Sequence, residues 1–441
     1  MRKIVLLVSM FAIAANMMAA DHVMAATKHA PKQEVSATLN LSLQEAQDYA
    51  VAQNRSLKNA DLAVQKAYAT RWQTIASMLP SVDMSWAYQS MMGYKMNFGG
   101  MPIEMPDNGT LGITASVGIN GQAIVGALLN NTAIEMQKLN LEISEDNLRA
   151  SVKSSYASVL VLEDVVKLLD SSLKNIENLA AMTQRSVEVG AAEQTTADQI
   201  LVRVNTLKNN INANKRSTQL AINALKVLLN VPAETELTLT TQLSDMLSAE
   251  AIVTLLGKDF VLENNLSYQT LAKNVELAKK NVHMAGWAYG PTIGVGYQYS
   301  EKDYFGKKEG FNMTPPNALS VQVSMPLWSS GKRAAGVVEK KIALEEARNT
   351  FEETADNLGI QNEQLRYNLQ NAYETYTNEQ ENMGVTQRVF DNTSLKFQQG
   401  VASNLDLVNA SNDLITAQST YVQAVLTLVN AEVELEKFLN L

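Results

Sequence analysis

Two very long stretches with almost no helix-breaking residues constrain this 441-residue chain more than any other feature. Ala127–Val189 contains neither Gly nor Pro, and Lys340–Gln399 contains only two glycines, which we expect to loosen its helix. A helix of about 63 residues extends for roughly 95 Å, which is longer than an ordinary globular domain requires. Each stretch is followed by a Gly turn and a second breaker-free segment, Glu193–Asn230 or Leu405–Leu441. The sequence therefore predicts two long helical hairpins with coiled-coil packing.

Between the helices, the hydrophobic period changes to that of a strand. Four segments alternate apolar with small or polar residues, namely 81–96, 110–120, 291–304 and 317–328. Such alternation over about ten residues is typical of a membrane β-barrel with a polar lumen. A soluble β-sandwich is the alternative. Aromatic residues of barrels gather at the lipid interface, and here we expect an aromatic girdle of Trp86, Tyr88, Tyr297, Tyr299 and Trp328.

The order of elements occurs twice in the chain. Asn54-Arg55-Ser56-Leu57 aligns with Asn265-Leu266-Ser267-Tyr268, and Leu229-Asn230 aligns with Leu439-Asn440. Each half contains a helix, a β-hairpin and a long helical hairpin, which is an internal duplication. We expect a first repeat at 41–232 and a second at 261–441, joined by an inter-repeat segment at 233–260. The predicted fold class is therefore α+β.

The first helix of the repeat has a recognisable start. Ser42 followed three residues later by Glu45 is a capping box, and Pro80 ends the breaker-free segment that begins at Leu41. We therefore expect one helix over most of Leu41–Leu79.

Residues 1–25 have the three parts of a secretory signal peptide. Two basic residues come first, Ile4–Ala15 is apolar, and Val23-Met24-Ala25 offers a cleavage site, with Ala20 as an alternative. The apolar part is shorter than the roughly 20 residues that a helical membrane span needs. We expect an exported protein in which 26–40 forms an N-terminal linker.

The composition leaves little room for catalysis. The chain has no Cys, only three His residues and a net charge of −9, which argues against thiolate sites, His-rich metal sites and nucleic acid as a partner. We expect no enzyme activity, no cofactor and no resident metal. Methionines cluster at 91–105, and thioethers can bind Cu(I), but apolar loop packing is the interpretation that we favour.

Four strands cannot enclose a channel, and lipid does not tolerate open sheet edges. Three copies would contribute twelve strands to one shared barrel, so we expect a homotrimer. A secreted coiled-coil scaffold or adhesin, with soluble strands, is the alternative from a different class.

These features resemble the TolC-like outer membrane efflux protein family. The resemblance is carried by the start Leu41–Ala46, the two β-hairpins, of which the second ends in Ser324–Trp328, and the turns at Gly190 and Gly400. It implies a trimer in the outer membrane, with a 12-stranded β-barrel continued by a long α-helical barrel in the periplasm. It also implies passive conduction of drugs or other small molecules from an inner-membrane transporter and a periplasmic adaptor protein. Type I protein secretion and heavy-metal efflux are alternatives within the family.

The resemblance also assigns residues to the periplasmic end of the channel. Thr196 and Asp406, six residues after the two turn glycines, would line the entrance. A ring of Asp406 carboxylates would favour cations, whereas a plain solvated helix position is the alternative. The tips that would contact the adaptor comprise Val189, Gly190 and Ala191 in the first repeat and Gln399, Gly400 and Val401 in the second.

Overall fold

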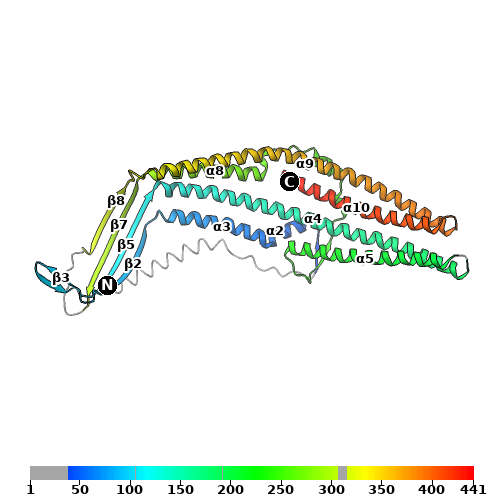
Figure 1. The fold of residues 1–441 in the computed structure, drawn as a ribbon, viewed down its shortest axis with the longest axis horizontal. Coiled ribbons are helices and arrows are strands. Elements are labelled where there is room, and N and C mark those ends of the chain that lie inside the picture. The colour runs from blue at the N-terminus through cyan, green and yellow to red at the C-terminus, as the bar shows by residue number, and fades with distance from the viewer. Residues whose placement is uncertain (1–37, 105, 191, 306–314) are drawn as a thin grey trace. The chain divides into compact units, whose positions relative to one another are not determined.

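The computed structural model describes residues 38–104, 106–190, 192–305 and 315–441, so the predicted signal peptide lies outside the described residues. The chain divides into two compact units (Figure 1). The strand unit comprises Leu62–Lys138 and Thr270–Glu352, and the helical unit comprises 38–61, Leu139–Gln269 and Glu353–Leu441. Within the described ranges, no helix has both the length and the hydropathy of a membrane span.

The strand unit is built on one antiparallel sheet with the order β2-β5-β7-β8. Its strands are β2 (Ser81–Gln89), β5 (Asn108–Asn120), β7 (Thr292–Tyr304) and β8 (Asn317–Ser324). All four coincide with alternating segments of the sequence, but β2 and β8 are shorter than the predicted 81–96 and 317–328. For β8, which ends at Ser324, the reason is Pro326, because proline lacks the N–H that a continued strand pairing would need.

A further hairpin that the sequence analysis did not predict lies between β2 and β5. It consists of β3 (Lys95–Phe98) and β4 (Met101–Glu104), joined by Gly99 and Gly100, whose φ angles are +57° and +90°. Two-residue hairpin turns favour glycine because they need positive φ. Met92 and Met101 are exposed in this region, so the prediction of apolar loop packing is wrong for these two side chains.

Every strand of the sheet connects to a helix at the same end. α3 (Arg55–Ala76) leads into β2, β5 into α4 (Gly121–Glu188), α8 (Leu266–Gly286) into β7 through the short η3 (Trp287–Tyr289), and β8 into α9 (Lys332–Gln398). Both long helices begin earlier than predicted, and α9 continues without a break through Gly336, Gly359 and Gly384.

An ion-pair network joins α4 to α8 within the strand unit. Lys280 Nζ lies 2.8 Å from Glu276 and donates to the Thr132 hydroxyl at 2.6 Å. Lys273 Nζ lies 2.6 Å from Glu135 and 3.3 Å from Glu276. Hydrogen bonds from Lys280 and Lys273 lower the pKa of Glu276 to about 2.

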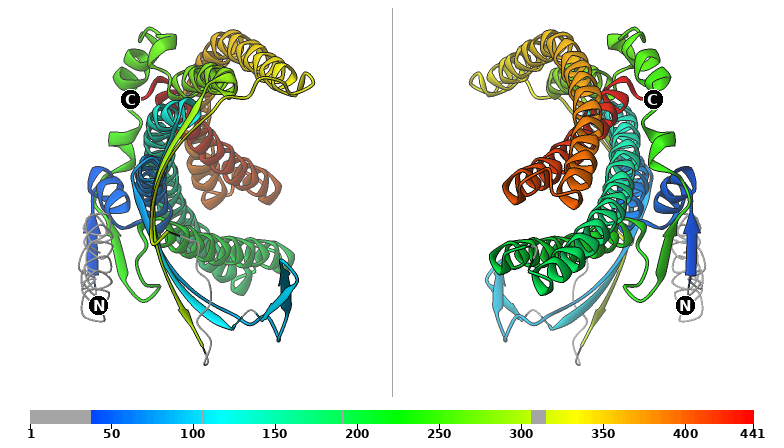
Figure 2. Two further views of the ribbon diagram at one scale, coloured as in Figure 1. Left: turned by 90° about the vertical axis from the view of Figure 1, so that its left-hand side faces the viewer. Right: turned by 90° about the vertical axis from the view of Figure 1, so that its right-hand side faces the viewer.

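The helical unit contains the far parts of the two long hairpins. α4 turns back as α5 (Gln194–Leu229), and α9 turns back as α10 (Asn404–Leu439); Figure 2 shows each pair side by side. The helices of the two repeats match in length, with 68 and 67 residues before the turn and 36 after it. The two hairpins share an apolar core, which includes Leu169 and Ile176 of α4, Ile200 and Leu207 of α5, Phe390 of α9, and Leu407 and Leu414 of α10.

A buried ion triad connects α4 to α10. Lys153 Nζ lies 2.8 Å from Glu432 and 2.7 Å from Glu436. Burial raises the pKa of the Glu432 carboxyl, and the nearby Lys153 ammonium opposes that shift. The sequence analysis did not identify this contact.

Two short strands lie in segments that the sequence analysis treated as linkers. β1 (Thr38–Leu41) pairs in parallel with β6 (Glu236–Leu239). The fully buried Tyr156 joins them, because its hydroxyl donates to the Leu41 carbonyl at 2.9 Å and accepts from the Thr241 N–H at 3.1 Å. The helical unit also contains α2 (Leu43–Gln53), α6 (Leu243–Met246), α7 (Ala249–Leu256) and η2 (Leu262–Asn264).

The predicted first helix is divided at Asn54, and this residue belongs to a contact that occurs twice. The Ser42–Glu45 capping box is present at the start of α2. Asn54 and Asn265 each accept a hydrogen bond from the N–H two residues later, at 2.8 and 3.0 Å. Each also donates to the carbonyl two residues before Asn230 or Asn440, at 2.9 and 3.1 Å.

The second asparagine of each pair completes the contact. Asn230 and Asn440, both with φ of +55°, end α5 and α10 in the left-handed conformation. Their amides donate to the carbonyl of the residue before Asn54 or Asn265. We call each set an asparagine clamp, because it joins the start of one helix to the end of another.

We predict that Asn265→Ala lowers the local free energy of unfolding at the start of α8 and the end of α10 by about 1–3 kcal/mol. The substitution leaves the buried carbonyl of Phe438 without its donor. Amide hydrogen exchange in detergent measures the loss. The control is Asn378→Ala at an exposed position of α9, and equal losses in both variants would contradict the role of the clamp.

A second prediction concerns acid. Because the pKa of Glu276 is lowered on folding, its ion pairs stabilise the α4–α8 contact above the unfolded pKa of about 4.3, and this contribution disappears as the pH falls toward about 2. Hydrogen exchange of α8 should therefore separate the wild-type protein from Glu276→Gln more at pH 6 than at pH 2.5, where part of this contribution has been lost. Glu353→Gln on α9 is the control, and a difference as large at pH 2.5 as at pH 6 would contradict this account.

Candidate functional site: the sheet faces and the helical tips

The strand register places the apolar residues of the sheet on one face. Residues paired across antiparallel strands share a face, and the register aligns Val82, Ala115, Tyr297 and Leu319 at one level. Leu319 is 73% exposed. A contiguous exposed apolar surface on a sheet is the kind of surface that faces lipid. The apolar residues of this face are Val82, Met84, Trp86 and Tyr88 of β2, Leu111, Ile113, Ala115, Val117 and Ile119 of β5, Ile293, Val295, Tyr297 and Tyr299 of β7, and Leu319, Val321 and Val323 of β8. At the end away from the helices, the acidic residues Glu301 and Asp303 of β7 share this face with Trp86 and Tyr88.

The opposite face is polar and made of small side chains. Ser81, Ser116, Gly296 and Ser320 lie at one level, which continues through all four strands. Two charged residues of opposite sign lie on this face, Asp83 at a level that continues through all four strands and Lys302 beyond the end of the β7–β8 pairing. This face therefore suits contact with water and leaves space beside the sheet.

The residues of the predicted aromatic girdle lie at several levels of the sheet. Trp86 and Tyr88 lie in the half of the sheet away from the helices, while Tyr297 and Tyr299 lie on either side of its middle. Trp328 follows β8 at the helix-bearing end and is 84% exposed. Aromatic residues at both boundaries of an apolar band are the expected pattern for a membrane barrel.

At the helix-bearing end the structure adds two aromatic residues that the sequence analysis did not assign, Trp287 and Tyr289. The Trp287 ring lies against Gly121, where an added Cβ would come within 2.1 Å of it. Glycine at the first position of α4 therefore allows Trp287 to pack at the junction of strand and helix. In the sequence, the one indication of this packing was an aromatic residue shortly before β7 begins at Thr292.

The two helical tips have the predicted glycine turns. Gly190 and Gly400 have φ angles of +74° and +72°, which L side chains rarely adopt. Val189 and Val401, beside these glycines, are exposed, as is Gln399. Ala191 lies outside the described residues. Exposed branched apolar side chains at the ends of long polar helices are candidates for a protein contact.

Asp406 has a structural partner that the sequence analysis did not foresee. Its carboxylate accepts hydrogen bonds from the Ser403 N–H at 3.0 Å and the Ser403 hydroxyl at 2.7 Å, which forms a capping box at the start of α10. Hydrogen bonds from Ser403 lower the pKa of Asp406, so the exposed side chain stays ionised. Thr196, its counterpart in the first repeat, donates its N–H to the Glu193 carbonyl and is half-buried.

The family model described as outer membrane efflux protein matches residues 47–231 and 259–441. The chain belongs to the outer membrane efflux protein family. It is therefore an outer-membrane channel protein with a periplasmic helical extension, a component of efflux systems and not an enzyme. This finding confirms the predicted channel class over the scaffold.

Known relatives of this outer membrane efflux protein are distant in sequence. The outer membrane efflux protein BepC of Brucella suis biovar 1 (strain 1330) is 22% identical over 301 residues, which cover 66% of this chain and 63%, less than two thirds, of BepC. The probable efflux pump outer membrane protein TtgC of Pseudomonas putida (strain KT2440) is 22% identical over 427 residues, which cover 90% of this chain and 83% of TtgC. In the crystal structure of the outer membrane protein VceC from Vibrio cholerae, the sequence is 15% identical to this chain. The match covers 90% of this chain and 95% of VceC with a TM-score of 0.73, which shows the shared fold.

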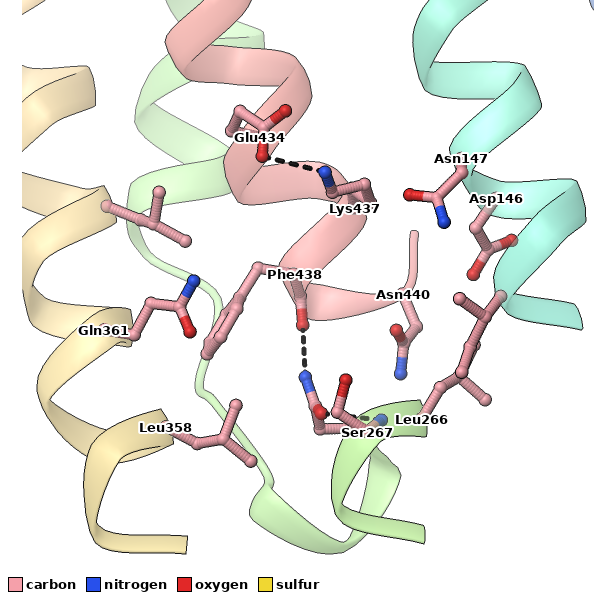
Figure 3. Close-up of a pocket in the computed structure, with 13 residues that line it drawn as sticks. Asp146, Asn147, Leu266, Ser267, Leu358, Gln361, Glu434, Lys437, Phe438 and Asn440 are labelled. Atoms are coloured by element: carbon pink, nitrogen blue, oxygen red, sulfur yellow. Dashed lines mark hydrogen bonds and ion pairs between the residues drawn. The ribbon is translucent and has the colours of Figure 1, made fainter. Parts of the chain in front are cut away.

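The helical unit of this efflux protein also holds a polar cavity of about 270 Å³ among α4, α8, α9 and α10. In Figure 3, Glu434 and Lys437 pair with each other, at 2.9 Å, and Asp146 and Asn147 line the opposite side. Within the described ranges, no group of three or more His, Cys, Asp or Glu residues is placed to hold a metal ion.

We predict that Asp406→Asn lowers the preference for cations in single-channel recordings, because it removes one carboxylate from the tip of the α9–α10 hairpin in each copy. The Asn side-chain oxygen can still accept the hydrogen bond from the Ser403 N–H, so the start of α10 is retained. Ser403→Ala is the matched control, since it weakens the cap and keeps the charge. If Ser403→Ala changes selectivity as much as Asp406→Asn, the cap and not the charge is responsible.

Proposed function

We propose that this protein is the exit duct of a tripartite efflux system. In this proposal, three copies form one 12-stranded outer-membrane barrel and a helical tunnel in the periplasm. Drugs or other small molecules enter from an inner-membrane transporter through a periplasmic adaptor and pass outward without any chemical change. The relatives TtgC and ArpC of Pseudomonas putida, a probable efflux pump and an antibiotic efflux pump outer membrane protein, support this class of cargo.

The observation that carries the proposal is the four-stranded sheet with one exposed apolar face and two outer strands. In the described part of the chain, β2 and β8 each pair with a single neighbouring strand of this sheet. Their other edges need hydrogen-bond partners if the apolar face lies in lipid. A second copy supplies such a partner, and a closed ring of copies removes every edge.

The polar face of the sheet supports passive conduction. If the apolar face contacts lipid, the face with Ser81, Ser116, Gly296 and Ser320 lines the lumen. Because Asp83 and Lys302 have opposite charges, this part of the duct carries little net charge and accepts solutes of either sign.

The helical tips are the parts that we assign to the adaptor. Val189 and Val401 are exposed next to glycine turns, where a helical hairpin of an adaptor could cover them. Asp406 and Thr196 begin the helices that return from these turns, so we assign them to the tunnel entrance.

The test combines the oligomeric mass with a sensitivity assay. The detergent-extracted protein should have the mass of three chains, because closure of the barrel requires it. Deletion of the gene should increase sensitivity to bile salts, dyes or detergents, and a plasmid copy should restore resistance. A stable monomer would contradict the shared barrel, and unchanged sensitivity to every compound would argue for protein secretion or metal efflux instead.

A further inference from the structure

The connection from β8 to α9 presents two exposed apolar side chains beside two basic ones. Leu327 and Trp328 are 90% and 84% exposed. Lys332 and Arg333 are the first two residues of α9, and we call them the basic pair. The four residues together are the boundary patch. Because the helical extension of this channel lies in the periplasm, the patch lies at the periplasmic end of the apolar sheet face.

The contacts of Arg333 hold its side chain in place without neutralising its charge. Its Nη1 donates to the Pro326 carbonyl at 3.2 Å, and its guanidinium lies 5.9 Å from the centre of the Tyr289 ring. Both partners are uncharged. Among the residues that the structure describes, no carboxylate forms an ion pair with Lys332 or Arg333. The basic pair therefore has two fixed positive charges and no counterion from these parts of the chain.

The sequence around this end of the sheet is also free of acidic residues. The segments 108–134, 284–300 and 315–338 connect β5, β7 and β8 to their helices, and the basic pair supplies the only charges in them. The segment that leads into β2, 62–82, has no acidic residue either. If β2 of a neighbouring copy pairs with β8, this segment of that copy brings no carboxylate to the basic pair. The chemistry calls for an anion from outside the protein.

The internal duplication shows that the fold does not need these cations. The alignment that pairs Asn54 with Asn265 also pairs Lys332 with Gly121 and Arg333 with Gln122. α4 begins at Gly121 just as α9 begins at Lys332, so the same strand-to-helix connection forms in the first repeat without any charge. Basic side chains in the first turn of a helix are unfavourable to its dipole. Stability of α9 therefore does not explain the basic pair.

We propose that the boundary patch binds anionic phospholipid in the leaflet that faces the periplasm. The lipid phosphate lies against the basic pair, and the acyl chains contact Leu327 and Trp328. Tryptophan is enriched at the level of lipid headgroups, and Lys and Arg near a membrane surface attract anionic lipids. This inference rests on the proposed function, because it takes the adjoining apolar sheet face as the surface in lipid. The bound headgroups fix the depth of the barrel in the membrane.

The fluorescence of Trp328 reports which lipid lies beside the patch. The full-length protein carries Trp72→Phe, Trp86→Phe and Trp287→Phe, so that Trp328 is its only tryptophan. It is placed in phosphatidylcholine vesicles that contain either brominated phosphatidylglycerol or brominated phosphatidylcholine at the same mole fraction. The anionic lipid should quench Trp328 at least about twofold more strongly than the zwitterionic one. The excess should fall when the salt rises from about 0.1 M to about 1 M, because the Debye length shrinks from about 10 Å to about 3 Å.

Two double variants separate the basic pair from charge in general. Lys332→Gln with Arg333→Gln should make the two brominated lipids quench Trp328 equally. Lys340→Gln with Lys341→Gln is the matched control, because it removes the same charge from the same helix about 12 Å further from the sheet. This control should keep the excess quenching by phosphatidylglycerol. Loss of the excess in both double variants, or in neither, would overturn the proposal.

The same measurements distinguish failure of this inference from failure of the proposed function. Strong and equal quenching by the two lipids, in a protein with the mass of three chains, would overturn headgroup recognition and leave the shared barrel intact. Quenching by neither lipid would show that protein covers the patch, and it would overturn the inference as well. A stable monomer would overturn the shared barrel.

A second measurement uses the protein with all its tryptophans. Added phosphatidylglycerol should raise its unfolding temperature in detergent more than added phosphatidylcholine does. This difference should disappear in the Lys332→Gln, Arg333→Gln variant and persist in the Lys340→Gln, Lys341→Gln control. An equal rise in all three proteins would contradict the proposed binding surface.

Discussion

The backbone polar groups along the outer edges of β2 and β8 are the constraint on which the rest of this structure depends. The register places an apolar face across all four strands, and in our proposal that face lies in lipid. Lipid offers no hydrogen bonds to an open edge, so the sheet requires a neighbour at both sides. In our proposal one ring of copies satisfies the edges and separates lipid from lumen.

The duplicated helices connect this sheet to the tips through repeated local contacts. The two repeats have nearly equal helix lengths. In each repeat an asparagine clamp joins the end of the last helix, α5 or α10, to the start of α3 or α8. In the helical unit, α4 also pairs with α10 through the buried Lys153–Glu432 contact. The two helical hairpins therefore have the same lengths and the same contact at their ends.

Much of this architecture could be predicted from the sequence because its signals are local. The absence of Gly and Pro predicted the long helices, period-2 alternation predicted the four main strands, and Gly190 and Gly400 predicted the turns. The β1–β6 pair could not be predicted, since Thr38–Leu41 meets a segment nearly 200 residues away.

Among the site residues, Asp406 shows the same limit. Its acidic character was evident, but its hydrogen bond with Ser403 depends on where α10 begins.

The central claim, that the apolar sheet face lies in lipid, is tested most directly by quenching of Trp86 fluorescence with brominated lipid. In a variant whose other three tryptophans are replaced by Phe, the account predicts strong quenching by lipids brominated on their acyl chains. Fluorescence of Trp86 that is unaffected by these lipids, yet quenched by a water-soluble quencher, would contradict it.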